Sequence, residues 1–468
     1  MDNPNPLAAI VLAAGEGKRM KSKTPKVLHC LGGVPILHYP LLLLETLHPA
    51  IGIVVVGHQA DRVTKALEGK SVQTILQPEQ KGTGDAVLKT LPLLKYFSGA
   101  VLILNGDTPL VSQDTLNVLL KTHRENAATV TLLTANLFNP KGYGRIIRGA
   151  PPAGEQENTL DRIVEEKDAT DEERKICEIN SGTYVVESVF LFDALQKISP
   201  ENQQKEYYLT DIVKIAKDAG KKVIAVLTHE EEVLGINSRA DLAAAEAIVQ
   251  KKIAQHWMNA GVTLIDPSRI RIDAEVTIGP DTVLHPGVSL EGKTKIGEGC
   301  VIHAGRIKDS QLDDHVLIQA FCVIEAAQIE SGVTVGPFAH LRPLTILRKG
   351  SKVGNFVEIK KSELGEGAKA NHLTYLGDAT VGKRVNIGAG TITCNYDGKK
   401  KHQTIIEDDV FIGSDTQFVA PVTIGSGSLI AAGSTVTKDV APDSLVISRG
   451  VQTTKAGWVK SGRRPRGD

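Results

Sequence analysis

Aliphatic residues recur every six positions over much of the second half of this chain, from about Ile272 to Val436. The recurring positions include Ile272, Ile278, Leu284, Leu290, Ile296 and Ile302, then Val335, Leu341, Leu347, Val353 and Ile359, and again Ile412, Phe418, Ile424, Ile430 and Val436. An α-helix repeats about every 3.6 residues and a single strand every 2, so neither produces this period. A parallel β-helix does, because its coils stack aliphatic side chains into columns while small residues let the chain turn tightly. The sequence therefore predicts a parallel β-helix of hexapeptide repeats.

The register of the repeat slips in places, for example between Leu364 and Ile387. Leu364, Ala370 and Leu376 keep the spacing of six, but Val381 follows after five residues and Ile387 after six more. We expect loops or irregular corners there.

The first half of the chain predicts a different fold. Short and nearly continuous apolar runs occupy residues 8–14, 51–56 and 100–104, as in strands buried on both faces of a mainly parallel sheet. Helix-like stretches lie between or after them, at 59–68, 84–94 and 114–126. This alternation predicts an α/β sandwich of Rossmann type, with residues 141–175 forming loops and edge strands across a substrate cleft.

A single helix is expected between the two halves. Ser238 can cap its start with Asp241 three residues on, and Gly261 can end it. An apolar stripe at helical spacing runs through Leu242, Ala245, Val249, Ile253 and Trp257. We therefore expect an α/β domain at 1–236, a helical linker at 237–261 and the β-helix at 262–468.

The composition narrows the class of protein. Lys plus Arg and Asp plus Glu each number 54 in 468 residues, so the balanced charge predicts neither a nucleic-acid nor a membrane partner. Residues 1–6 lack the features of a signal peptide, and no apolar stretch is long enough to span a bilayer. The five cysteines show no metal-binding spacing, which predicts free thiols in a cytoplasmic protein. The tail with Arg463, Arg464 and Arg466 is expected to be solvated, the alternative being a basic nucleic-acid arm.

A glycine-containing loop follows the first apolar run. The segment from Gly15 to Met20 reads G-E-G-K-R-M, which is neither a Walker A loop nor a dinucleotide fingerprint. In an open α/β sheet ligands bind beyond the carboxyl ends of strands, where glycine lets backbone N–H groups approach phosphate oxygens. Taken alone, this loop is as compatible with a plain tight turn as with a phosphate site.

The longer string L-A-A-G-E-G-K-R-M, followed by Pro25 and Lys26, resembles the signature of sugar-phosphate nucleotidyltransferases. These enzymes join a sugar 1-phosphate to a nucleoside triphosphate and release pyrophosphate. The resemblance implies that Arg19 and Lys26 neutralise the triphosphate in catalysis. Lys18 departs from the family pattern, in which Thr is common.

Further resemblances follow in chain order. The family pattern implies Mg²⁺ ligands at Asp107 and Asn237, a sensible pair of hard oxygen donors. It places Tyr208 and Thr210 near the sugar. The residues implied to bind UTP and the nucleotide sugar are Leu12, Gly15, Lys26, Gln77, Gly82, Thr83, Gly144, Glu165, Asn180 and Asn237.

Polar residues interrupt the second half of the repeat where a passive coil would not need them. His372 is the candidate base for acetyl transfer to an amine, and Glu358 could orient it. Arg342 and Lys360 would hold a sugar phosphate, with Tyr375, Asn386 and Lys401 completing the sugar site. The alternatives are a purely structural solenoid and a buried histidine that only satisfies a backbone carbonyl.

Together the two halves resemble the family of bifunctional N-acetylglucosamine-1-phosphate uridyltransferases / glucosamine-1-phosphate acetyltransferases. The strings L-R-P, N-F-V-E, H-L-T-Y-L-G-D, N-I-G-A-G-T-I-T-C-N-Y-D-G and I-S-R carry the match in the second half. The resemblance implies a left-handed β-helix, a homotrimer, and use of acetyl-CoA and UTP to make UDP-N-acetylglucosamine for peptidoglycan and lipopolysaccharide. It implies acetyl-CoA contacts at Ala389, Asn395, Tyr396, Ser414, Ala432 and Arg449.

Two other functions stay open at this point. ADP- or GDP-sugar pyrophosphorylases join a similar α/β domain to a β-helix used for regulation, which would leave a single activity. The β-helix could instead be a non-catalytic scaffold for oligomers. Each of these functions predicts small molecules as partners. For the favoured function they include glucosamine 1-phosphate and N-acetylglucosamine 1-phosphate.

Overall fold

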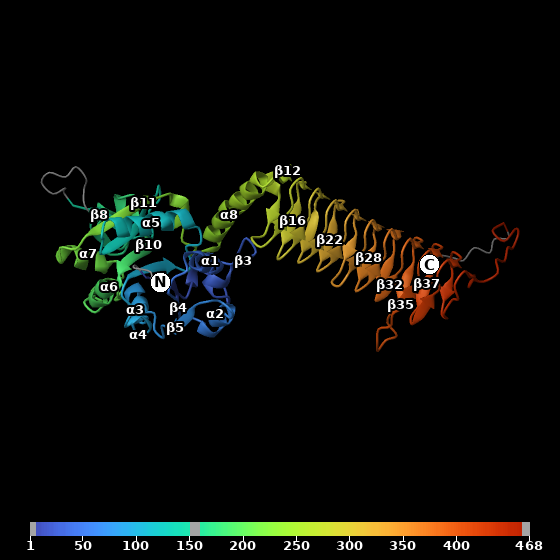
Figure 1. Cartoon of the computed structure of the whole chain (residues 1–468), viewed down its shortest axis with the longest axis horizontal. Helices are drawn as coiled ribbons and strands as arrows, with labels where there is room; N and C mark the ends of the chain where they lie inside the picture. The colour runs from blue at the N-terminus through green and yellow to red at the C-terminus, as the bar shows by residue number, and fades with distance from the viewer. Residues whose placement is uncertain (1–5, 150–159, 461–468) are drawn as a thin grey trace. The chain divides into compact units, whose positions relative to one another are not determined.

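A computed structural model describes residues 6–149 and 160–460, so the arginines of the C-terminal tail lie outside the described residues. The chain divides into two compact units, Met1–Val249 and Gln250–Asp468 (Figure 1). No helix among the described residues is long and apolar enough to cross a membrane.

The first unit is built on one mainly parallel sheet with the strand order β11-β7-β10-β6-β1-β4-β5. The central strand β1 (Leu7–Ala13) pairs in parallel with β4 (Ile51–Val56) and β6 (Ala100–Asn105), so the three predicted strands are confirmed. β10 (Glu178–Glu187) runs antiparallel to β6 and β7. The other members are β5 (Gln73–Leu76), β7 (Val130–Asn136), β11 (Val223–Thr228), β8 (Arg145–Arg148) and β9 (Leu160–Val164).

Helices cover both faces of this sheet and form a core on each face. The side chains of β1 point alternately into these two cores. Ala8 and Ile10 pack with α3 (Thr83–Leu88), α6 (Ser188–Leu195) and α7 (Asp211–Asp218). Ala9 and Val11 pack on the other face with α1 (His38–Leu47), α2 (Ala60–Ala66) and α5 (Gln113–Glu125).

The helical stretch expected at 84–94 is two helices instead of one. α3 ends at Leu88, and α4 (Leu91–Leu94) starts anew with Pro92 in its first turn. Proline lacks the N–H that would continue a helix but fits the first turn of the next one, so the chain restarts there.

The helix predicted between the two halves is observed as α8 (Arg239–Asn259). Ser238 and Asp241 form the expected reciprocal cap: Asp241 N donates to Ser238 Oγ at 3.2 Å, and Ser238 N donates to Asp241 Oδ2 at 2.8 Å. Gly261 follows the helix with a φ of +89°, a conformation that few other residues adopt. The boundary between the two compact units falls inside this helix.

The second unit is the predicted parallel β-helix, with three parallel sheets running along its length (Figure 1). One sheet runs from β12 (Thr263–Leu264) to β41 (Leu445–Val446), and the second runs from β13 (Arg271–Ile272) to β40 (Thr435–Val436). The third runs from β14 (Thr277–Ile278) to β38 (Val422–Ile424). Each coil gives one short strand to each sheet, and the aliphatic columns form one continuous buried core.

The slip in the repeat has a local explanation. Leu364, Leu376, Val381 and Ile387 are all buried in the core, so this region has tight corners and no inserted loop. The corner at Asp378 is made by a left-handed residue with a φ of 48°. The inserted loop lies further on, between β34 (Ile392–Cys394) and β35 (Thr404–Ile406).

Candidate active sites

The predicted phosphate loop folds against Lys26. Gly17 has a φ of 64°, and a Cβ placed on it would lie 2.7 Å from Cβ of Lys26. Glycine at this position therefore lets the loop close over the Lys26 side chain. Arg19 is exposed, and Lys18 is exposed and pairs with Glu16 at 2.6 Å, so the atypical lysine makes a surface ion pair. Gly15 has open space beside its Cα.

Lys26 lies between the two residues expected to bind a metal. Its ammonium forms a short ion pair with Oδ2 of Asp107 and donates to Oδ1 of Asn237 at 3.1 Å. Asp107 follows β6, whereas Asn237 precedes α8, so the fold joins positions 130 residues apart in sequence. The Lys26 and Asp107 side chains are only 12% and 23% exposed, so their attraction is weakly screened.

A hollow of about 190 Å³ opens beside this pair and collects most of the predicted nucleotide-sugar residues. Its lining includes Leu12, Thr83, Asp107, Gly144, Glu165, Asn180 and Asn237. Tyr143, which the sequence reasoning did not assign, also lines it and accepts a hydrogen bond from Gly235 N at 3.2 Å. The hollow lies at the carboxyl ends of β1 and β6, where open α/β sheets bind their ligands.

Glu165 is one of the residues lining this hollow whose pKa is shifted. Burial raises the pKa of the Glu165 carboxyl, although Thr210 donates a hydrogen bond to its Oε1 at 3.2 Å and opposes the shift. Burial also raises the pKa of Asp211, at the start of α7, to about 6, with Asp168 adding a smaller repulsion. A carboxyl group with a raised pKa stays protonated to a higher pH than a hydrated one, and in that form it can donate a hydrogen bond as well as accept one.

Gln77 and Gly82, two of the residues expected to bind UTP, are held by internal hydrogen bonds. Gln77 is buried, and its Nε2 donates to Asp85 Oδ2 at 2.7 Å and to the carbonyl of Gly82 at 3.1 Å. Gly82 has a φ of +109°, and a Cβ on it would lie 2.5 Å from the carbonyl oxygen of Tyr207. Sequence reasoning missed Asp85, whose partnership with Gln77 depends on the turn of α3.

In the β-helix, His372 lies in a column of corner residues that also contains several of the residues expected to bind acetyl-CoA. His372, Ala389, Ser414 and Ala432 occupy the same position, two residues after the buried column residues Ala370, Ile387, Ile412 and Ile430 that pair in register. The backbone of this corner is linked from coil to coil, with Asp415 N donating to Ala389 O at 2.7 Å and Gly433 N donating to Ser414 O at 2.8 Å. The fold therefore brings together residues up to 60 positions apart.

The partner of His372 differs from the expected one. Nδ1 of His372 is 3.0 Å from Oδ1 of Asn355, while Glu358 accepts a hydrogen bond from Arg342 at 2.9 Å. Among the described residues of one chain, no hydrogen bond joins Glu358 to His372. Arg342 reaches Glu358 because β28 (Glu358–Lys360) lies on the next coil of the same sheet as β25 (His340–Leu341). Asn355 belongs to the quoted N-F-V-E string, but the sequence reasoning gave it no role.

The other residues expected at the sugar site lie on two neighbouring sheets of the β-helix. Tyr375 pairs in register with Glu358, and Asn386 pairs with Lys369 on the next coil of the sheet that carries His372. The Lys360 and Lys401 side chains are neighbours, and Lys401 lowers the pKa of Lys360, with Arg342 adding to the effect. Three positive side chains at one place suit a dianionic phosphate group.

The residues implied for acetyl-CoA are mainly exposed. Ser414, Ala432 and Arg449 lie on the surface, and Nη1 of Arg449 donates to the carbonyl of Ala432 at 2.7 Å. Tyr396 is 61% exposed on the inserted loop, whereas Asn395 is buried and donates to Oδ2 of Asp378 at 2.7 Å. Asn395 therefore fixes the base of the loop in this structure.

An apolar ladder adjoins the His372 column. Phe321, Phe338, Phe356 and Leu373 occupy the next corner position on four successive coils, each with a positive φ. Their exposed fractions are 61, 48, 55 and 62%, and the phenylalanine rings stack at centroid distances of 5.3 and 5.4 Å. A contiguous exposed apolar column of this kind is typical of surfaces that bind another molecule.

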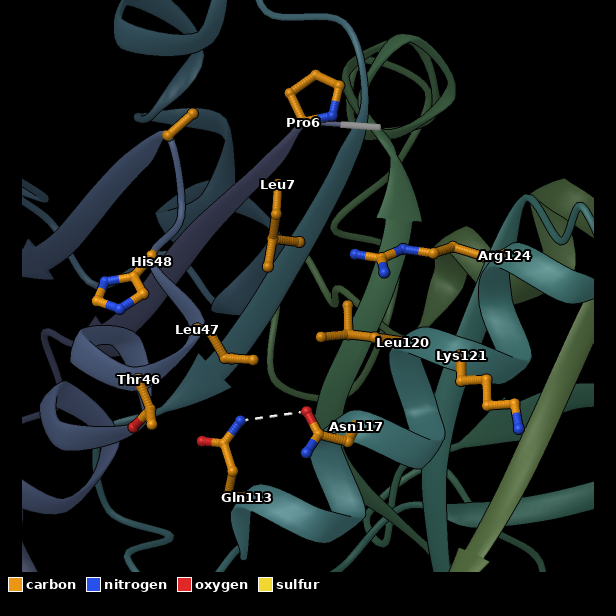
Figure 2. A pocket seen from close by; sticks show the side chains of 11 residues that line it. Pro6, Leu7, Thr46, Leu47, His48, Gln113, Asn117, Leu120, Lys121 and Arg124 are labelled. Carbon is orange, nitrogen blue, oxygen red and sulfur yellow. Dashed lines mark hydrogen bonds between the residues drawn. The ribbon is translucent and has the colours of Figure 1, made fainter. Parts of the chain in front are cut away.

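A second hollow in the first unit contains none of the predicted residues. It measures about 860 Å³ and lies between α1 and α5, near the amino end of β1, with Leu7, His48 and Arg124 in its wall (Figure 2). Gln113 and Asn117 face it and are hydrogen-bonded at 3.2 Å (Figure 2). Since ligands of open α/β sheets bind at the opposite edge, this hollow is not the candidate active site.

The fold and the two sites define a class of protein, a nucleotidyltransferase joined to a hexapeptide-repeat transferase. The model of the MobA-like NTP transferase domain matches residues 9–171, and that of the bacterial transferase hexapeptide matches residues 275–305 and 403–438. Proteins named Bifunctional protein GlmU are 52% identical in Geotalea uraniireducens and 49% in Pelobacter propionicus, covering 97% of this chain and 99% and 98% of those proteins. The Geobacter sulfurreducens relative is 48% identical, with 98% of both chains covered.

The chain belongs to this family of bifunctional GlmU proteins. Because these relatives cover both halves, a bifunctional enzyme is favoured over a pyrophosphorylase with a purely regulatory β-helix. The α/β fold followed by hexapeptide coils, expected from the resemblance to be left-handed, agrees with this family.

Proposed function

We propose that the β-helix acetylates glucosamine 1-phosphate and that the α/β unit then transfers a uridylyl group from UTP to the product. Family membership supports both activities, which together make UDP-N-acetylglucosamine, a precursor of peptidoglycan and lipopolysaccharide. One observation carries the assignment of the first unit: Lys26, Asp107 and Asn237 meet beside the predicted sugar residues. The five cysteines are free thiols, which supports a cytoplasmic location.

In the β-helix, His372 removes a proton from the amine while the amine nitrogen attacks the carbonyl carbon of acetyl-CoA. The new C–N bond forms, the C–S bond breaks, and the proton passes through His372 to the departing thiolate of CoA. Arg342, Lys360 and Lys401 hold the phosphate, and Tyr375 and Asn386 hold the sugar. The backbone N–H of Ala389 stabilises the oxyanion, because it belongs to the column of the base.

In the α/β unit, an oxygen of the sugar phosphate attacks the α-phosphorus of UTP, and pyrophosphate leaves. Lys26 and Arg19 neutralise the triphosphate, while Gly144, Glu165 and Asn180 position the sugar in the hollow that they line. The segment of Gln77, Gly82 and Thr83 reads the base. Such transfers need positioning and charge neutralisation more than covalent chemistry.

Mg²⁺ fits the pair of Asp107 and Asn237. No group of three or more His, Cys, Asp or Glu residues that could hold a metal occurs in the described part of the chain, so this pair would need oxygens of the nucleotide to complete a shell. Its two oxygens already converge on a positive charge, the Lys26 ammonium. When bound, Mg²⁺ supplies further neutralisation of the triphosphate. Lys26 competes for the same oxygens until phosphate oxygens attract its ammonium.

This competition predicts the behaviour of Lys26→Met. Removing the ammonium should tighten Mn²⁺ binding in the absence of nucleotide about tenfold, measured by electron paramagnetic resonance, because a charge-assisted hydrogen bond no longer opposes the ion. The same variant should lose uridylyl transfer by about a hundredfold or more, since the triphosphate loses a cation. Adding Asp107→Asn should abolish the gained Mn²⁺ affinity. Equal Mn²⁺ affinities for wild type and Lys26→Met would contradict the competition.

We further propose that the chain works as a homotrimer in which the Phe321–Phe338–Phe356–Leu373 ladder is covered by another copy. Exposed apolar side chains in one straight column are removed from water when the coils of another copy lie alongside. The ladder adjoins the exposed His372, so the acetyl-transfer site would be completed between chains.

The first test of both activities uses one tube with glucosamine 1-phosphate, acetyl-CoA, UTP and Mg²⁺, analysed by mass spectrometry. UDP-N-acetylglucosamine with free CoA is the expected result. Accumulation of N-acetylglucosamine 1-phosphate would contradict the proposed first-unit site, and absence of both products would contradict the whole proposal.

A further inference from the structure

The hydrogen bond between Asn355 and His372 is built into the backbone of two adjacent coils. β27 (Lys352–Asn355) and β30 (Lys369–His372) pair in parallel, with Asn355 opposite His372. Leu373 N donates to the carbonyl of Asn355 at 3.1 Å, which fixes the backbone on both sides of the pair. A Cβ on Gly354 would lie 2.0 Å from the carbonyl of Asn371, so the coils approach closely here.

We propose that Asn355 is a positioning residue for acetyl transfer, whose side-chain oxygen accepts a hydrogen bond from Nδ1 of His372 and leaves Nε2 free to take the proton of the amine. The proposal rests on the proposed function, in which His372 is the base. An amide oxygen can only accept, and neutral imidazole carries one N–H, so the pair selects one tautomer.

A neutral partner suits a base better than a carboxylate would. A carboxylate beside Nδ1 would favour imidazolium before the amine arrives, whereas an amide fixes the ring and leaves it neutral. The nearby carboxylate, Glu358, is held by Arg342 at 2.9 Å. The other charged or titratable groups on the strands around His372 are Lys352, Lys360, Lys369 and Tyr375.

The test compares Asn355→Ala, Asn355→Asp and His372→Ala in the full-length enzyme. Asn355→Ala should lower kcat for acetyl transfer about tenfold or more, with KM for both substrates changed less than about twofold, because the ring loses its tautomer and orientation but the substrates keep their contacts. Asn355→Asp should recover much of kcat, and the acidic limb of its pH–rate profile should move to higher pH. That movement requires the side chain at position 355 to lie against the titrating imidazole, whereas a purely structural role of Asn355 would change stability together with kcat.

Uridylyl transfer and the oligomeric state report whether each variant folds, and both should match the wild type. Gln311→Ala is a matched control, since Gln311 is an exposed amide on a distant coil whose side chain, among the described residues, bonds only to Asp313. The inference is overturned if Asn355→Ala keeps the wild-type kcat and pH profile, or if Asn355→Asp leaves the acidic limb unmoved. Should His372→Ala retain full acetyl transfer, the proposed base itself is wrong, which separates the two failures.

Discussion

At the scale of single residues, the burial of Asp211 links its titration to stability; this residue follows Thr210, which lines the hollow beside Asp107 and Asn237. Burial raises the pKa of its carboxyl to about 6, above the ordinary value near 4. The native state therefore holds this proton more tightly than the unfolded chain does. The stabilisation contributed by the protonated form is fully present below about pH 4 and is lost as pH rises through about 6.

Asp211→Asn is therefore expected to stabilise the first unit near pH 7.5 by about 1 kcal/mol, after allowing for partial solvent screening and a weaker interaction with the helix dipole. The gain should vanish below about pH 4, where the aspartate is protonated. Thermal unfolding across this pH range measures it. Asp218→Asn, at the exposed end of the same helix, is the control and should show no such pH dependence. A gain for Asp211→Asn that persists at pH 3.5 would contradict the argument.

The residues that sequence reasoning missed are those whose partners depend on three-dimensional turns. The period of the repeat could have suggested Asn355, because it lies 17 residues before His372, about one coil. Nothing in the sequence predicts that Arg342 pairs with Glu358, since several carboxylates lie one coil away from it. The position of Lys26 between Asp107 and Asn237 likewise depends on how three distant loops meet.

At the scale of elements, the start of α8 supports the predicted metal site. Oδ2 of Asp241 accepts hydrogen bonds from the backbone N of Asn237 at 3.0 Å and of Ser238 at 2.8 Å. The cap of the helix therefore also fixes the backbone of a proposed metal ligand. The spacing of Ser238 and Asp241 was enough to predict the cap, but the second bond to Asn237 appears only in the fold.

Asp241→Ala should lower the free energy of unfolding of the first unit by about 1 kcal/mol, the usual loss for a helix cap. It should also raise the Mg²⁺ concentration needed for half-maximal uridylyl transfer, because Asn237 loses its fixed backbone, while acetyl transfer stays unchanged. Lys251→Ala, at an exposed position of the same helix, is the control. An unchanged Mg²⁺ requirement together with lowered stability would show that the cap is purely structural.

The long elements of the chain were the easier part to predict. In the β-helix the same aliphatic columns appear on every coil, so a period of six fixes both the strands and the residues that face the core. In the α/β unit, strands buried on both faces read as continuous apolar runs, which located β1, β4 and β6. Corners and short helices were harder, because a single proline or left-handed residue decides where they break.

At the scale of the whole molecule, the two proposed sites differ in how completely a single chain encloses them. The hollow of the uridylyl site is lined within one unit, whereas His372 is exposed beside an uncovered apolar ladder. The double variant Phe338→Asp/Phe356→Asp places charges in the middle of that ladder. Desolvating two carboxylates costs several kcal/mol, so the copies should separate.

Sedimentation of this double variant should show monomers where the wild type is trimeric, with acetyl transfer lowered at least about a hundredfold because each site loses its second chain. Uridylyl transfer per chain should stay within about twofold, since its residues come from one unit. Phe138→Asp is the matched control, because Phe138 is 99% exposed in the first unit and lies outside the ladder. A double variant that remains trimeric would place the contact between copies on another surface. A monomer with full acetyl transfer would show instead that one chain holds the complete site, so these two measurements decide separately what covers the ladder and what completes the site.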